Sequence, residues 1–138
     1  MTWALVAVAG GLGAIARFTV DSRVSAALAS RGGAEGQRGH RGHRARPPLG
    51  TIVVNLSACL ALGILVGAAV APAWLQVTVG TGFLGGYSTF STACLEGARL
   101  WLDGRGAAAL VHGLAMTAGT LAAAALGVLL GAMGAAAL

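Results

Sequence analysis

Charged residues are scarce in this 138-residue sequence. Aspartate, glutamate, lysine and arginine make up 9% of it, whereas hydrophobic residues make up 57% and the mean hydropathy is +0.81. Soluble domains carry about 25% charged residues. The composition therefore excludes an ordinary soluble domain and predicts an all-α integral membrane protein that forms a single domain over residues 1–138.

Lysine is absent, and all nine basic residues are arginines. With four acidic residues the net charge is +5, a balance that basic nucleic-acid-binding proteins share. Here, however, the arginines gather between the apolar stretches or at their ends, where basic residues orient a membrane protein. We therefore expect no nucleic-acid partner and attribute the charge to membrane topology.

Only two cysteines occur, Cys59 and Cys94, and both lie in apolar stretches. Neither has a neighbour at a metal-ligand spacing, so both are expected to be small apolar side chains. His40 and His43 also lack cysteine or carboxylate company, which favours a solvated basic loop over a metal site. The N-terminus has no basic segment before its apolar run, so a cleaved signal peptide is not expected.

Four apolar stretches are long enough to cross a cell membrane. They are predicted over residues 3–20, 49–71, 74–100 and 107–133. Residues 21–48 are predicted to form a long, disordered loop, because a segment so rich in glycine and arginine cannot bury a core. Four spans place both termini on one side and the arginine-rich loops on the other. The positive-inside rule then predicts cytoplasmic loops and external termini.

The first span contains Gly11-x-Gly13-x-x-Ala16, the pattern of a dinucleotide-binding turn. No alternation of strands and helices follows it, so a soluble nucleotide-binding enzyme is rejected, and the glycines are expected to allow close helix packing. Arg17 ends this span. It is expected either to reach the membrane interface or to face a water-filled vestibule, and the sequence does not choose between the two.

Polar side chains inside the spans mark the candidate functional positions. Thr51 and Asn55 are four residues apart and share one helical face. Asn55 is costly to expose to lipid, so it faces a cavity or serves as a contact between helices. In the fourth span His112, Met116 and Thr120 follow at four-residue steps. There a histidine is often hydrogen-bonded between helices, and a threonine often bonds back to its own helix.

Residues 80–95, GTGFLGGYSTFSTACL, interrupt the third span. Glycines and hydroxyl residues gather there around Phe83, Tyr87 and Phe90. Backbone at membrane depth needs internal partners unless it is buried in protein or lines a wet cavity. The composition thus predicts a broken helix whose free N–H and C=O groups face an ion or a partner.

This stretch resembles the signature of the Fluc or CrcB family of fluoride channels. The family pattern is roughly G-F-x-G-G-x-T-T-F-S-T-F with a glutamate three residues later, and residues 82–93 and Glu96 follow it. Two further motifs agree, G-x-x-G-A-x-x-R-[FY] over residues 10–18 and G-T-x-x-x-N over residues 50–55. The resemblance implies a non-enzymatic, fluoride-specific channel that lets fluoride leave the cell. It also implies an antiparallel dimer of four-helix subunits, with two fluoride pathways along the interface.

The resemblance further implies a structural Na⁺ at the dimer centre, held by the backbone carbonyls of Gly85 and Ser88. Fluoride must exchange its water for hydrogen-bond donors, and Phe90 can offer it the positive edge of an aromatic ring. Arg17 matches an arginine that concentrates anions at the mouth. The residues implied to line the pathway are Thr51, Asn55, Phe90, Ser91, Thr92, His112 and Thr120.

Two departures from the family pattern bear on the partner. Ala93 stands where the family has a second phenylalanine, so one ring of each pathway is missing. The arginine bias fixes one orientation, whereas a homodimer of inverted subunits needs nearly balanced loops. We therefore hypothesise an oppositely oriented paralogue that supplies the phenylalanine, with a homodimer as the alternative.

Two other functions compete with the channel. A four-helix drug/proton antiporter needs a carboxylate in a central pathway, but the first span has none, and Glu96 lies near a helix end, three residues from Arg99, where the two can pair. A structural membrane subunit would account for the small-residue ridges Gly63–Gly67 and Gly127–Gly131, but not for the hydroxyl cluster over residues 88–92.

Overall fold

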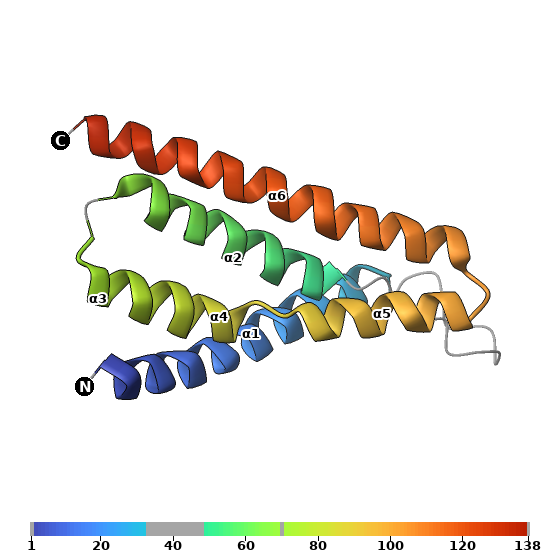
Figure 1. Ribbon diagram of the computed structural model, residues 1–138. Coiled ribbons are helices and arrows are strands. Elements are labelled where there is room, and N and C mark those ends of the chain that lie inside the picture. Colours follow the sequence, from blue (N-terminus) through green and yellow to red (C-terminus); the bar gives the residue numbers. More distant parts are fainter. Residues whose placement is uncertain (1, 33–48, 70, 138) are drawn as a thin grey trace.

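The computed structural model describes residues 2–32, 49–69 and 71–137, and this part of the chain is helical without any strand (Figure 1). The predicted all-α class is therefore confirmed. The elements in chain order are α1 (Thr2–Gly32), α2 (Leu49–Ala68), α3 (Ala73–Gln76), the π-helix η1 (Val77–Leu84), α4 (Gly85–Tyr87), α5 (Phe90–Leu102) and α6 (Gly106–Ala136).

Three of the described helices are long and apolar enough to cross a membrane. They cover Thr2–Ala27, Leu49–Ala68 and Gly106–Ala136. Large apolar side chains on them face outward, such as Trp3 and Leu121, which are 84% and 67% exposed. Helices that are apolar on every side suit a lipid environment, so the chain is a multi-pass membrane protein.

The first loop begins later than the sequence predicts. Helix α1 continues past residue 20 to Gly32, so the prediction of a loop from residue 21 was wrong for residues 21–32. This stretch is rich in alanine and other residues that tolerate a helix, and it contains no proline. The rest of the predicted loop, residues 33–48, lies outside the described residues. Helix α2 ends at Ala68, before residue 71, because Ala69 takes a left-handed conformation with φ 51°.

Helices α2 and α6 pack along each other through glycines. A Cβ atom at Gly63 would collide with the carbonyl oxygen of Ala124, and one at Gly127 would collide with that of Leu60. Small residues let two helix backbones approach this closely. The prediction that these glycine ridges are packing surfaces is confirmed.

Helix α1 approaches the broken segment in the same way. A Cβ atom at Gly13 would collide with the carbonyl oxygen of Phe83, and one at Gly86 would collide with that of Gly10. The packing role predicted for the glycines of the first span is therefore confirmed for Gly13, but not for Gly11, where a Cβ atom would meet nothing within 4 Å.

The broken segment from α3 to α5 runs along the bundle beside the three long helices (Figure 1). Its first part, η1 and α4, packs against α1, and its last part, α5, packs against α6. The segment therefore changes partner where it breaks. Both chain ends lie at one end of the bundle, and the turn from α5 to α6 lies at the other.

Candidate functional site

The third segment breaks at Ser88 and Thr89, inside the stretch that the sequence singled out. Their backbones are extended, with φ −73° and ψ 161° at Ser88 and φ −150° and ψ 120° at Thr89. Helix α4 ends just before them, and α5 begins just after, at Phe90. Upstream lies the π-helix η1, a wider turn that is frequent at functional sites.

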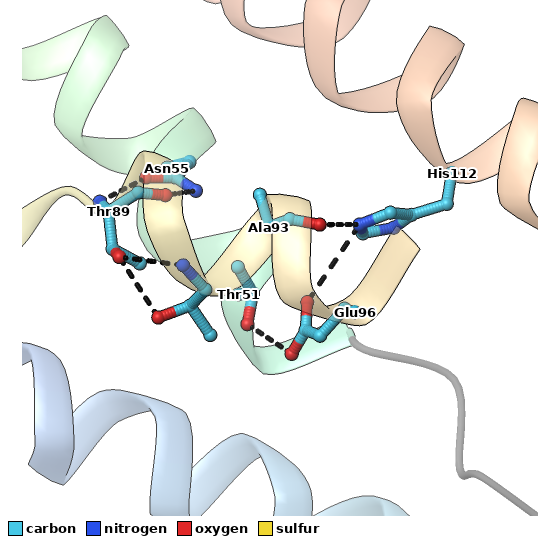
Figure 2. A network of polar contacts seen from close by, with 7 residues as sticks. Thr51, Asn55, Thr89, Ala93, Glu96 and His112 are labelled. Atoms are coloured by element: carbon cyan, nitrogen blue, oxygen red, sulfur yellow. Dashed lines mark hydrogen bonds and ion pairs between the residues drawn. The ribbon is translucent and has the colours of Figure 1, made fainter. Parts of the chain in front are cut away.

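The Asn55 side chain binds both backbone polar groups of Thr89 (Figure 2). Its amide nitrogen donates to the Thr89 carbonyl oxygen at 2.8 Å, and its amide oxygen accepts from the Thr89 N–H at 2.7 Å. Both residues are buried. The two bonds replace the helical partners that an extended residue lacks. Because the NH₂ group carries two hydrogens, one of them remains for another acceptor.

Thr89 also caps the start of α5. Its Oγ1 accepts from the Thr92 N–H at 3.3 Å, and it lies 3.0 Å from Thr92 Oγ1 and 3.4 Å from Ser91 Oγ. A threonine in this position satisfies one of the unpaired N–H groups of the first turn. The remaining first-turn N–H groups, with the helix dipole, give the break a partial positive charge.

Carbonyl groups beside the break lose their helical donors, since a helical carbonyl bonds the N–H four residues on, and for two of them the structure shows where that donor goes instead. The Thr89 N–H, which would reach the Gly85 carbonyl, bonds to Asn55 Oδ1. The Thr92 N–H, which would reach the Ser88 carbonyl, bonds to Thr89 Oγ1. Both carbonyl oxygens are thereby left without that donor.

A cavity of about 500 Å³ opens between α2, α5 and α6. Four of the predicted pathway residues line it: Asn55, Phe90, His112 and Thr120. Ser88, Thr89 and Ala93 line it as well. The Phe90 side chain is 85% exposed, so its ring stands away from the helices of its own subunit.

A second cavity of about 210 Å³ lies on the α1 side of the break. Arg17, Thr51 and Thr92 line it, and Asp21 lines it too. Thr89 borders both cavities. The structure therefore divides most of the predicted pathway residues between two adjoining cavities, while Ser91 is exposed on the surface of α5.

Glu96 links α5 to both α2 and α6, and the sequence motifs alone did not place it among the site residues (Figure 2). Thr51 Oγ1 donates to its Oε1 at 2.7 Å, and His112 Nε2 lies 3.8 Å from its Oε2. Glu96 thus turns inward, whereas Arg99, with which its spacing would allow pairing, is exposed. The glutamate at the end of the family signature was the sequence signal for this contact.

His112 and Thr120 of α6 have the ordinary roles that the sequence left open. His112 Nε2 lies 3.2 Å from the Ala93 carbonyl oxygen, so the ring bridges α6 and α5. Thr120 Oγ1 donates back to its own helix, to the carbonyl oxygens of Met116 at 2.6 Å and Thr117 at 3.1 Å. Its hydroxyl hydrogen is therefore engaged, although the side chain borders the larger cavity.

Comparison with known proteins places the chain in a family. The protein-family model described as "CrcB-like protein, Camphor Resistance (CrcB)" matches residues 4–132 of this chain. The chain belongs to the CrcB family. This confirms the resemblance seen in the three sequence motifs.

Curated CrcB relatives match the chain over almost its full length. A protein named Fluoride-specific ion channel FluC 2 from Cutibacterium acnes is 39% identical, over 95% of this chain and 98% of its own. Proteins named Fluoride-specific ion channel FluC 1 come from Leifsonia xyli subsp. xyli and Symbiobacterium thermophilum. The Leifsonia protein is 39% identical, over 91% of this chain and 83% of its own length. The Symbiobacterium protein is 37% identical, over 95% of this chain and 98% of its own length.

Proposed function

We propose that this CrcB-family chain forms a fluoride-specific ion channel, not an enzyme, through which fluoride leaves the cell down its electrochemical gradient. The observation that carries the proposal is the 37–39% identity to curated fluoride-specific channels over more than nine-tenths of the chain. The polar break at Ser88 and Thr89, set in an apolar bundle, supplies the site. A helix-forming membrane subunit without transport would have no use for this break.

The proposed pathway follows the two cavities that meet at Thr89. Fluoride exchanges its water for the second amide hydrogen of Asn55, the first-turn N–H groups of α5 and the positive ring edge of Phe90. These groups attract an anion without a strong charged site that would trap it. Arg17, at the smaller cavity, concentrates anions at the mouth. The side chains assigned to the pathway are Thr51, Asn55, Phe90, Ser91, Thr92, His112 and Thr120.

A structural Na⁺ is part of the same proposal. Hard cations take oxygen ligands, and the carbonyl groups of Gly85 and Ser88 are the two whose helical donors are diverted to Asn55 and Thr89. An inverted second subunit would contribute the same two oxygens, which makes four. Na⁺ bound by these carbonyl groups would supply the positive charge that holds the two broken segments together.

Removing Na⁺ is expected to stop fluoride efflux without unfolding the subunit. Proteoliposomes are prepared with N-methylglucamine as the cation, and fluoride efflux is compared with matched Na⁺ vesicles. A loss of efflux that small additions of Na⁺ restore is expected, since carbonyl oxygens need a small, hard cation. Equal efflux in the two cations would argue against this site.

The subunit is proposed to work as an antiparallel dimer embedded in membrane lipid, with an oppositely oriented paralogue as partner and a homodimer as the alternative. The exposed ring of Phe90 supports a contact beyond its own subunit. The described arginines favour cytoplasmic loops and external termini, because Arg99 and Arg105 lie beside the turn opposite the chain ends. A reporter enzyme fused to the C-terminus tests the orientation, and activity only on the cytoplasmic side would contradict it.

The proposed function is tested by reconstitution. Liposomes containing the protein are loaded with potassium fluoride in a buffer that also contains Na⁺, valinomycin is added, and a fluoride electrode follows the release. Rapid, complete release of fluoride is expected, and chloride-loaded vesicles should retain their chloride. Because the chain is proposed to pair with a paralogue, the experiment is run both with and without co-expressed partner. Absence of fluoride release in both preparations would refute the channel.

A further inference from the structure

The three tryptophans of the chain lie at the two ends of the helical bundle. Trp3 begins α1 and Trp74 begins α3, at the end where the N-terminus lies, whereas Trp101 lies near the end of α5, beside the turn to α6 (Figure 1). Their side chains are 84%, 55% and 68% exposed. None of the three forms a hydrogen bond among the described residues.

An exposed indole ring suits one layer of a membrane. It combines a large apolar surface with a single N–H donor, so it is best placed where one end meets acyl chains and the other meets water and headgroups. Tryptophan is accordingly enriched at both interfaces of membrane proteins. Exposed tryptophans at both ends of an apolar bundle therefore mark two levels at which phospholipid headgroups can begin.

The distance between the two tryptophan levels matches the thickness of a bilayer. Gly13 of α1 lies beside the break, because a Cβ atom there would come within 2.9 Å of the Tyr87 nitrogen. Ten residues of α1 separate Trp3 from Gly13, a rise of about 15 Å, and eleven residues of α5 separate Phe90 from Trp101, a rise of about 16 Å. The two levels are thus about 31 Å apart, and the hydrocarbon core of a bilayer is about 30 Å thick.

The charged residues of α1 agree with these levels. The helix carries no charge from Thr2 to Ala16. Arg23 is exposed and lies about 30 Å along the helix from Trp3, at the second level, where an arginine can reach the headgroups. Arg17 and Asp21 lie between the two levels, and both line the smaller cavity. Charged side chains at membrane depth are expected to face such a cavity.

We propose that the three tryptophans hold the subunit in the bilayer by binding the boundary between phospholipid headgroups and acyl chains, with Trp3 and Trp74 in one leaflet and Trp101 in the other. The break at Ser88 and Thr89 then lies at the middle of the membrane. This placement goes beyond the proposed channel and does not depend on it.

The placement has two consequences for the site. Arg17 lies about 10 Å inside the boundary marked by Trp101, so its guanidinium group faces the smaller cavity and not the membrane interface. An inverted second subunit would carry its own break at the same depth, because inversion about the middle of the bilayer leaves that level unchanged.

The placement is tested by quenching of tryptophan fluorescence in vesicles whose lipids carry a nitroxide either just below the headgroup or at the end of an acyl chain. Three variants of the full chain each keep one native tryptophan and replace the other two with phenylalanine. In each, the shallow nitroxide is expected to quench about twice as strongly as the deep one, since an interfacial indole lies far from the chain ends.

Leu12→Trp provides the matched control, in a chain whose three native tryptophans are all phenylalanine. Leu12 is 55% exposed and lies nine residues along α1 from Trp3, close to the level of the break. Its indole should be quenched more strongly by the deep nitroxide. The wild-type protein is measured first, because it needs no substitution to fold, and its total fluorescence should prefer the shallow nitroxide.

Stronger quenching of any native tryptophan by the deep nitroxide would overturn the placement. So would a Leu12→Trp indole at the same depth as the native ones, or native indoles that neither nitroxide quenches, because a protein surface would then cover them. These outcomes leave the channel standing. Conversely, shallow quenching with no fluoride efflux would support the placement and count against the channel.

Discussion

Asn55→Ala is expected to lower fluoride efflux by at least about tenfold, equivalent to about 1.4 kcal/mol in the barrier, and to loosen the broken segment. The substitution removes both hydrogen bonds to Thr89, at 2.8 Å and 2.7 Å. Each buried backbone group that loses its partner costs about 1–3 kcal/mol. It also removes the spare amide hydrogen that is proposed to meet fluoride.

A second substitution separates the two roles of Asn55. Asn55→Asp keeps an oxygen for the Thr89 N–H but loses the donor to the Thr89 carbonyl oxygen, and it adds negative charge to the pathway. We expect a folded protein with strongly reduced efflux. The melting temperature in detergent reports stability, and the fluoride electrode reports transport.

Ser57→Ala is the matched control for both variants. Ser57 lies on the same helix and bonds to the Tyr87 hydroxyl at 2.9 Å, but that contact is exposed. Its loss should leave efflux close to the wild-type value, since exposed hydrogen bonds contribute little to stability. Wild-type efflux in Asn55→Ala would be fatal to the proposed pathway.

Asn55 connects the cation site and the anion pathway of the proposed channel. By accepting from the Thr89 N–H it leaves the Gly85 carbonyl without its helical donor, which makes that oxygen available to a cation. By holding Thr89 extended it also sets the start of α5, where unpaired N–H groups face an anion. One side chain therefore positions groups of opposite polarity on the two sides of the break.

The sequence predicted the position of the break, because glycine and hydroxyl residues gathered in an apolar run favour a backbone that leaves the regular helix. It also predicted that Asn55 would avoid lipid. It did not predict the role of Thr89, since a threonine that caps a helix looks the same in sequence as one that bonds elsewhere. The sequence offered one cue, a threonine directly before the helical run that begins at Phe90.

Glu96 shows why spacing alone can mislead. At three residues from Arg99 it fits a surface ion pair on one helix, but such pairs are worth little in water. The structure instead brings Thr51 of α2 and His112 of α6 to the same carboxylate. Contacts between residues far apart in sequence follow from the packing of the helices, and the spacing of residues within one helix does not predict that packing.

The sequence also underestimated the length of α1. The predicted span ended where the apolar residues end, but the polar residues that follow also tolerate a helix, so the helix continues to Gly32.

Ala93→Phe is expected to raise fluoride efflux about tenfold when this chain is reconstituted alone, equivalent to about 1.4 kcal/mol in the barrier. Ala93 lines the larger cavity one helical turn from Phe90, and the cavity of about 500 Å³ has room for a ring. The new ring would supply the second aromatic edge that the family signature has and this chain lacks. The bond to His112 uses the Ala93 backbone oxygen, so it survives the substitution.

The expectation follows from the proposed division of work between two subunits. If an oppositely oriented paralogue normally supplies the phenylalanine, the wild-type chain alone should transport poorly, and co-expression with that paralogue should restore efflux as well as Ala93→Phe does. Ala98→Phe is the matched control, because Ala98 is exposed on the same helix and does not border the cavity residues described above. Full efflux from the wild-type chain alone, unchanged by Ala93→Phe, would instead establish a working homodimer in which the position of Ala93 needs no ring.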